Sequence, residues 1–278
     1  LNSGWLKYKS EQKYLGAIFT DTGSVKIDVK LFLDKKSKEV NVKLARFLVK
    51  NEFAPVSVKL KVVNACINAA LTYSCEAWGS CPLNTVEILQ RKALKLILNV
   101  SSSTPNEIVY IESGYQTLQP LIFKRQLKFF RKIMEDCEAN PQSTISQLYA
   151  LALQSNTQFL RHYKKLDAAF NTPRHCFNHY AQIQKTESEL KIQNKFESDP
   201  DSILGTYKRI NPTLQQPAFY RNICCHELDR KTITRYRVGC HYLKIQSGRL
   251  AGNDRNTRIC TCHNEVQTLA HVLFNCPL

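Results

Sequence analysis

The chain has 278 residues, of which 39 are Lys or Arg and 23 are Asp or Glu, so its formal net charge is +16 and its pI is about 9.4. A hydrophobic fraction of 43% in a chain of this length excludes a disordered tail and indicates a folded core. The cationic excess is typical of proteins that bind polyanions, although a basic protein without such a partner has the same composition.

The N-terminal segment predicts a short β element followed by a helical region. Residues 13–20 place β-favouring side chains around Gly16, and residues 21–24 carry a turn signal. From Val25 to Lys50 the apolar residues take helical spacing, which predicts one or two amphipathic helices.

Three further helices are predicted before residue 139. Pro55 opens a helical stretch that Gly79 ends, and its side opposite Lys59 and Lys61 is almost wholly apolar, so this helix is expected to be buried. The next helix follows Pro82, and another covers about residues 118–137; both combine an apolar face with a basic face.

The two basic faces are candidate nucleic-acid contacts. A single basic helix face is usually solvated surface, whereas two in succession favour contact with phosphates. The residues concerned are Arg91, Lys92, Lys95, Lys124, Arg125, Lys128 and Arg131.

Residues 140–216 are polar, rich in Gln, Asn and Ser, and interrupted by four prolines, which predicts a helical connector. The sequence therefore predicts a mainly α fold with a small β-hairpin at the N-terminus and a Cys/His-containing C-terminal region from residue 217. No run of about 18 apolar residues predicts a membrane span, and the start without Met suggests that the chain is a fragment.

The C-terminus contains a compact set of metal-ligand residues. Cys260 and Cys262 are followed, after eight residues, by His271 and, after four more, by Cys276. Three thiolates and one imidazole are the ligands that structural Zn²⁺ prefers, and four protein ligands leave no open position for a catalytic water. His263 stands beside the first pair and is an alternative ligand. A short helix over residues 270–274 is expected to present the later ligands.

Other clusters leave alternatives open. Residues 224–226 (Cys-Cys-His) and 240–241 (Cys-His) allow a second metal site, but isolated thiols and a surface imidazole are the favoured interpretation. Polymerase chemistry needs closely placed carboxylates for two metal ions, and the sequence has no Asp-Asp pair. A nuclease built from Asp201, Asp229 and Lys231 is the weaker alternative, because such a pattern arises easily by chance.

Several motifs stand in a fixed order along the chain. They are Lys-Tyr-Leu-Gly at 13–16, Leu-Thr-Tyr-x-x-Glu-x-Trp at 71–78, a basic helical run at 89–134, and Arg-x-Gly-x-His with Ser-Gly-Arg at 237–249, ahead of the Cys/His set. Together they resemble the part of jockey-like LINE (non-long-terminal-repeat) retrotransposon reverse transcriptases that follows the catalytic palm. The resemblance is thinnest over residues 140–216.

The resemblance implies a domain order and a function. It implies a remnant of the primer-grip hairpin in residues 1–24, a helical thumb in 25–139, a connector in 140–216 and a zinc-knuckle region in 217–278. It also implies that Tyr14, Leu15 and Gly16 contact the primer end. The function it implies is binding of RNA and DNA, as template-primer and target, beside the palm and fingers of the parent polymerase.

In this family the catalytic Asp-Asp block lies upstream of the matched region, so Mg²⁺ belongs to the parent polymerase and synthesis by this chain alone is not expected. The resemblance places the protein inside the cell, in the nucleus and cytoplasm. The alternative is a structural or protein-interaction module that derives from a decayed or co-opted element.

Overall fold

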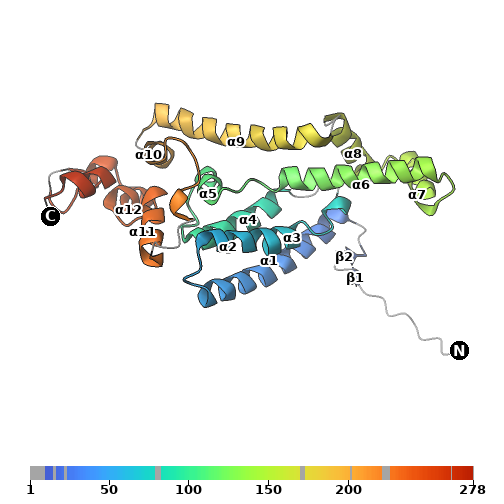
Figure 1. The fold of residues 1–278 in the computed structure, drawn as a ribbon, viewed down its shortest axis with the longest axis horizontal. Coiled ribbons are helices and arrows are strands. Elements are labelled where there is room, and N and C mark those ends of the chain that lie inside the picture. The colour runs from blue at the N-terminus through green and yellow to red at the C-terminus, as the bar shows by residue number, and fades with distance from the viewer. Residues whose placement is uncertain are drawn as a thin grey trace. The chain divides into compact units, whose positions relative to one another are not determined.

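The computed structural model describes residues 10–14, 17–21, 24–78, 83–169, 173–200, 202–220, 226–263 and 265–277. Over these residues the chain is mainly α-helical with one small antiparallel hairpin, which confirms the predicted fold class (Figure 1). Among the described helices, none combines the length and the apolar character that a bilayer crossing requires.

The chain divides into two compact units that alternate along the sequence. The first unit contains residues 1–50, 61–93 and 116–186, and the second contains residues 51–60, 94–115 and 187–278. The predicted connector, residues 140–216, contributes to both units.

The first unit begins with the hairpin of β1 (Glu11–Tyr14) and β2 (Ala17–Thr20), in which Glu11 pairs with Thr20 and Tyr14 with Ala17. A single helix, α1 (Val25–Lys50), follows. The carboxylate of Asp28 in its first turn accepts hydrogen bonds from the backbone amide (2.9 Å) and the hydroxyl (2.7 Å) of Thr20. These bonds fix the hairpin to the start of α1.

The apolar stretch after Pro55 forms a helix that changes pitch along its length. It runs from α2 (Val56–Val62) through a π-helical segment (Val63–Asn68) to α3 (Ala69–Leu71), and a 3₁₀ turn (Cys75–Ala77) follows. Its apolar residues are largely buried, as predicted, but Lys59, which the sequence places on the opposite side, is buried too and pairs with Glu227 at 3.1 Å. The next helices are α4 (Leu83–Leu98) and α6 (Gln119–Ala139), with α7 (Thr144–Gln154) and α8 (Gln158–Ala169) after them.

Polar side chains of α6 and α8 donate additional hydrogen bonds to backbone carbonyls at the end of α3 and in the 3₁₀ turn. Arg125 donates to the carbonyl of Thr72 (3.1 Å), and Gln126 donates to that of Cys75 (2.9 Å). Tyr163 of α8 is fully buried and stacks on Phe130 of α6 at 5.1 Å. Helix ends buried in a core need such donors, because an unpaired carbonyl is costly there.

The second unit is built from α5 (Asn106–Ser113), the end of α9 (Pro173–Ser198), α10 (Ile203–Ile210), α11 (Glu227–Arg237) and α12 (Lys244–Leu250) (Figure 1). Short 3₁₀ segments cover Ala218–Tyr220 and Arg255–Thr257, and a π-helical turn covers His271–Asn275. Its core contains Ile108, Ile111, Ile192, Tyr207, Leu214 and Val238.

A buried carboxylate organises this core. Glu112 of α5 has no solvent exposure and accepts hydrogen bonds from the hydroxyls of Tyr207 and Tyr220, both at 2.8 Å. Arg237 of α11 forms an ion pair with the same carboxylate at 3.0 Å. Burial of a carboxylate is tolerable only when its charge and its lone pairs have such partners.

Candidate metal centre and nucleic-acid interface

The metal-ligand residues lie on a small turn and a short helical segment at the end of the second unit. Ile259 and Val266 form an antiparallel bridge, and the backbone amide of Cys260 donates to the carbonyl of Glu265 (2.8 Å). The hydroxyl of Thr268 caps the second segment by accepting from the backbone amide of His271 (3.1 Å). The sequence predicts a short helix at this place, and the segment is π-helical.

The four predicted ligands come together. The sulfur atoms of Cys260 and Cys276 are 3.7 Å apart, and the sulfur of Cys262 is 3.1 Å from Nε2 of His271. All four ligand atoms lie within 4.8 Å of one another. In a tetrahedron with a metal–sulfur distance of about 2.3 Å, neighbouring ligands are about 3.8 Å apart. The cluster can therefore hold a metal ion without rearrangement of the backbone.

The surroundings of the cluster favour metal binding further. A hydrogen bond from the backbone of Cys262, with contributions from the neighbouring thiol and imidazole groups, lowers the pKa of the Cys260 thiol to about 6. Metal ligation requires the thiolate, so this shift favours the form that binds. The carboxylate of Glu265 lies 3.1 Å from Nδ1 of His271. A carboxylate at this nitrogen fixes the imidazole with Nε2 towards the metal position.

Sequence reasoning did not identify Glu265, although a carboxylate between the ligand pairs was an available signal. His263, the alternative ligand, is exposed and has a positive φ of 61°. It is not a member of the cluster. Its backbone amide donates to the carbonyl of Cys260 (2.9 Å), so His263 forms the turn that carries Cys262.

The segment from Arg258 onward (the knuckle), which carries the four predicted ligands, is anchored to α12 by Arg258 and Gln267. Arg258 donates to the carbonyl of Ile245 (3.0 Å), and the side chain of Gln267 accepts from the backbone amide of Lys244 (2.8 Å). Gly248 lies beneath the Arg258 side chain, and a Cβ at this position would be 2.8 Å from its Cγ. A glycine at this point of α12 thus allows the arginine to cross the helix.

The other predicted clusters each have members that lie outside the described residues. Cys224, Cys225 and Asp201 lie outside the described residues, so the second metal site and the nuclease hypothesis have no structural account. The thiol of Cys240 lies 2.8 Å from the hydroxyl of Thr104. Lys231 pairs with Glu52 at 2.9 Å.

Four of the seven basic side chains on the predicted nucleic-acid faces make contacts within the protein. Arg91 pairs with the glutamate one turn earlier (3.5 Å), and Arg125 donates to the carbonyl and hydroxyl of Thr72. Lys95 donates to a carbonyl of the loop after α4 (2.7 Å), and Arg131 pairs with an aspartate of α8 (3.1 Å). Arg125 therefore serves the packing of the first unit.

The remaining three, Lys92, Lys124 and Lys128, are exposed. Lys132 is exposed as well and follows Lys128 by one turn of α6, so Lys124, Lys128 and Lys132 form a stripe along that helix. Tyr14 belongs to β1, whereas Leu15 and Gly16 lie outside the described residues.

No protein-family model, no curated protein and no solved structure matches the chain.

Proposed function

We propose that this chain is the nucleic-acid-binding C-terminal part of a LINE-type RNA-directed DNA polymerase, with a structural Zn²⁺ site and without a polymerase active site of its own. The observation that carries the proposal is the convergence of Cys260, Cys262, His271 and Cys276 in a chain of net charge +16. The order of the sequence motifs supports the choice of family.

Zn²⁺ has a structural part in this proposal. The ligand atoms form a closed set of three thiolates and one imidazole, as structural zinc prefers. When bound, the ion would hold the turn at Cys260 and Cys262 against the segment of His271 and Cys276. Glu265 would keep the imidazole oriented.

The nucleic acid is expected to lie along the exposed lysines of α6. Lys124, Lys128 and Lys132 are spaced one helical turn apart, about 6 Å along the axis, which is close to the distance between successive phosphates of one strand. Such contacts position a backbone and do not read its sequence. We therefore expect similar affinities for unrelated sequences.

The test is binding of an RNA–DNA hybrid to the whole chain, measured by fluorescence anisotropy at low salt. Replacing Lys124, Lys128 and Lys132 by Ala should weaken binding on the order of tenfold or more, because three phosphate contacts and their released counterions are lost.

The matched control replaces Lys38, Lys43 and Lys50 of α1, which are also exposed and belong to the same unit. This variant has the same net charge as the α6 variant and should bind within about twofold of the wild type. Equal losses in both variants would show that only the overall charge matters. No binding by the wild type would refute the proposed function.

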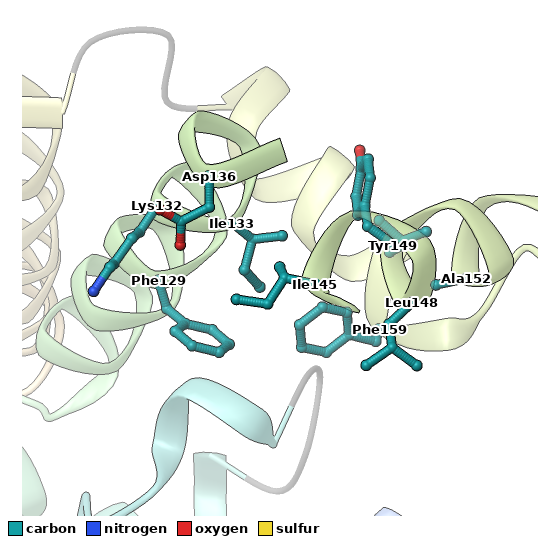
Figure 2. Close-up of a pocket in the computed structure, with 10 residues that line it drawn as sticks. Phe129, Lys132, Ile133, Asp136, Ile145, Leu148, Tyr149, Ala152 and Phe159 are labelled. Atoms are coloured by element: carbon teal, nitrogen blue, oxygen red, sulfur yellow. The ribbon is translucent and has the colours of Figure 1, made fainter. Parts of the chain in front are cut away.

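Protein binding is the second candidate function, and an apolar groove favours it. The groove has a volume of about 440 Å³; its apolar lining includes Phe129 and Ile133 of α6 and Ile145 and Leu148 of α7, and Lys132 of the lysine stripe also lines it (Figure 2). Exposed apolar surface of this kind is typical of interaction sites. The Leu148→Asp change in the groove should leave binding of the RNA–DNA hybrid unaltered; a loss as large as that of the lysine variant would argue that the two surfaces have one function.

A further inference from the structure

The second unit contains a groove lined by residues of three helices and of the C-terminal segment. It has a volume of about 750 Å³ and lies between α10, α11, α12 and the segment that carries His271. This volume is within the range of sites that enclose a small organic ligand. The Arg-x-Gly-x-His and Ser-Gly-Arg motifs both contribute to its wall, and neither is used by the metal cluster.

The groove is cationic. Its described lining includes Arg209, Arg237, Arg249 and Arg255 and contains no Asp or Glu. Arg237 is neutralised by its ion pair with Glu112, whereas Arg249 donates to the uncharged amide oxygen of Gln246. Burial, followed by the repulsion of Arg258, lowers the pKa of Arg249, although the nearby carboxylate of Asp199 acts in the opposite direction. An anion in the groove would relieve this repulsion.

The groove also offers flat apolar surfaces and an unused hydrogen-bonding atom. The ring of His241 stacks on that of Tyr236, with centroids 5.3 Å apart. Nδ1 of His241 is buried and has no hydrogen-bond partner among the described residues. Phe274 also lines the groove and is 82% exposed. A phenylalanine with this exposure contributes little to the packing of the described residues.

We propose that this groove binds an unpaired nucleotide of single-stranded RNA or DNA, with its base on Phe274 and its phosphate at Arg209 and Arg249. This inference rests on the proposed function and assigns to it a second contact, separate from the lysine stripe of α6. Guanidinium groups form bidentate hydrogen bonds with phosphate oxygens, and aromatic side chains stack on bases of any sequence.

A single strand fits these features better than a duplex or an acidic peptide. The bases of a duplex are stacked on one another and cannot reach an aromatic ring inside a groove. An acidic peptide would satisfy the arginines but would leave Phe274 without a partner. The combination of cations with an exposed aromatic ring is typical of single-strand binding surfaces.

The experiment compares labelled 12-nucleotide single strands of RNA and of DNA with the corresponding duplexes, using the full zinc-loaded chain. The double variant Arg209→Ala, Phe274→Ala should bind both single strands about tenfold or more weakly than the wild type does, and the duplexes within about twofold. The RNA and DNA arms show whether the groove discriminates between the two. Because both side chains are exposed, the variant should retain its helical circular dichroism and its zinc content.

The control variant is Tyr242→Ala, Lys244→Ala, which removes an aromatic ring and a positive charge from exposed positions outside the groove. It should bind all four ligands as the wild type does. In addition, the Phe274→Trp variant should restore single-strand affinity and show quenched tryptophan emission on binding.

The inference is overturned if the groove variant leaves single-strand affinity unchanged, or if it weakens duplex binding to the same extent. Both results are distinct from failure of the proposed function, in which the wild type binds none of the four nucleic acids. If the groove variant abolishes binding of an acidic peptide but leaves single-strand binding unchanged, the groove belongs to a protein partner and the inference is also overturned.

Discussion

At the scale of single residues, Glu112 carries a buried carboxylate, and its three hydrogen-bond donors lie far from it in the sequence. The hydroxyls of Tyr207 and Tyr220 and the guanidinium of Arg237 all point to it. Helix α5 is not among the helices predicted from the sequence, and apolar spacing gives no reason to place a buried glutamate there. The donors lie about 95 to 125 residues away in the chain, so no local pattern in the sequence links them.

We predict that Glu112→Ala lowers the free energy of unfolding by about 3–5 kcal/mol, because it leaves Arg237 and two tyrosine hydroxyls without their acceptor. Urea denaturation followed by circular dichroism measures this loss. The control is Glu197→Ala on the exposed side of α9, which should cost less than about 0.5 kcal/mol. A loss of similar size in the two variants would contradict the structural role of Glu112.

The environment of Glu227 predicts that the free energy of unfolding depends on pH. Burial raises the pKa of Glu227, but hydrogen bonds from Arg230 and Lys59 outweigh burial, so its pKa lies below the ordinary value. A carboxyl with a lowered folded-state pKa stabilises the protein above the unfolded-state value, about 4.3, and this contribution is lost as the pH falls through the folded-state value.

The unfolding free energy should therefore decrease between pH 5 and pH 3, and Glu227→Gln should reduce that decrease. Urea denaturation at several pH values tests this, with Glu197→Gln as a control that should keep the wild-type slope. An identical slope in the Glu227→Gln variant would show that the pKa of Glu227 is not lowered by folding.

At the scale of elements, the knuckle is too small to fold by burial of apolar surface alone. Segments below about 40 residues usually need a metal ion or disulfides. Its position is fixed by the contacts of Arg258 and Gln267 with α12 and by the cluster of four Cys and His side chains.

Chelation of the metal should unfold the chain from about residue 258 onward and leave the helices of the first unit intact. Hydrogen exchange read out by mass spectrometry locates this loss. Cys276→Ser should have the same effect as the chelator, whereas His263→Ala should keep the metal, since His263 is exposed and outside the cluster. Retention of zinc by His271→Ala combined with its loss in His263→Ala would show that the ligand assignment is wrong.

Elements with a strong local signal could be predicted from the sequence. The hairpin around Gly16 and the helices over residues 25–50 and 118–137 follow from turn residues and apolar periodicity. The π-helical segment Val63–Asn68 has the same composition as a regular helix, so no pattern marks its change of pitch. The clustering of the four Cys and His side chains could be predicted, because residue type and spacing nearly determine such a site.

At the scale of the whole molecule, the alternation of the chain between two units could not be predicted. The sequence suggests four consecutive segments, whereas α2, α4 and α9 each extend from one unit into the other. Which helix packs in which unit depends on long-range pairs such as Lys59 with Glu227, at 3.1 Å. Long-range pairing also explains Arg125, which the sequence predicts as a phosphate contact and which donates to Thr72 in the structure. Arg91 is different, because it pairs with a glutamate only one turn earlier in the same helix.

The central claim is that the protein binds nucleic acid through the phosphate backbone, and the salt dependence of binding tests it most directly. For the whole zinc-loaded chain and an RNA–DNA hybrid, neutralisation of about six phosphates predicts a slope near −5 in a plot of log affinity against log salt concentration. The Lys124, Lys128 and Lys132 variant should have a slope shallower by about 2 to 3. A wild-type slope between about 0 and −1 would mean that few phosphates are neutralised, and it would contradict the account.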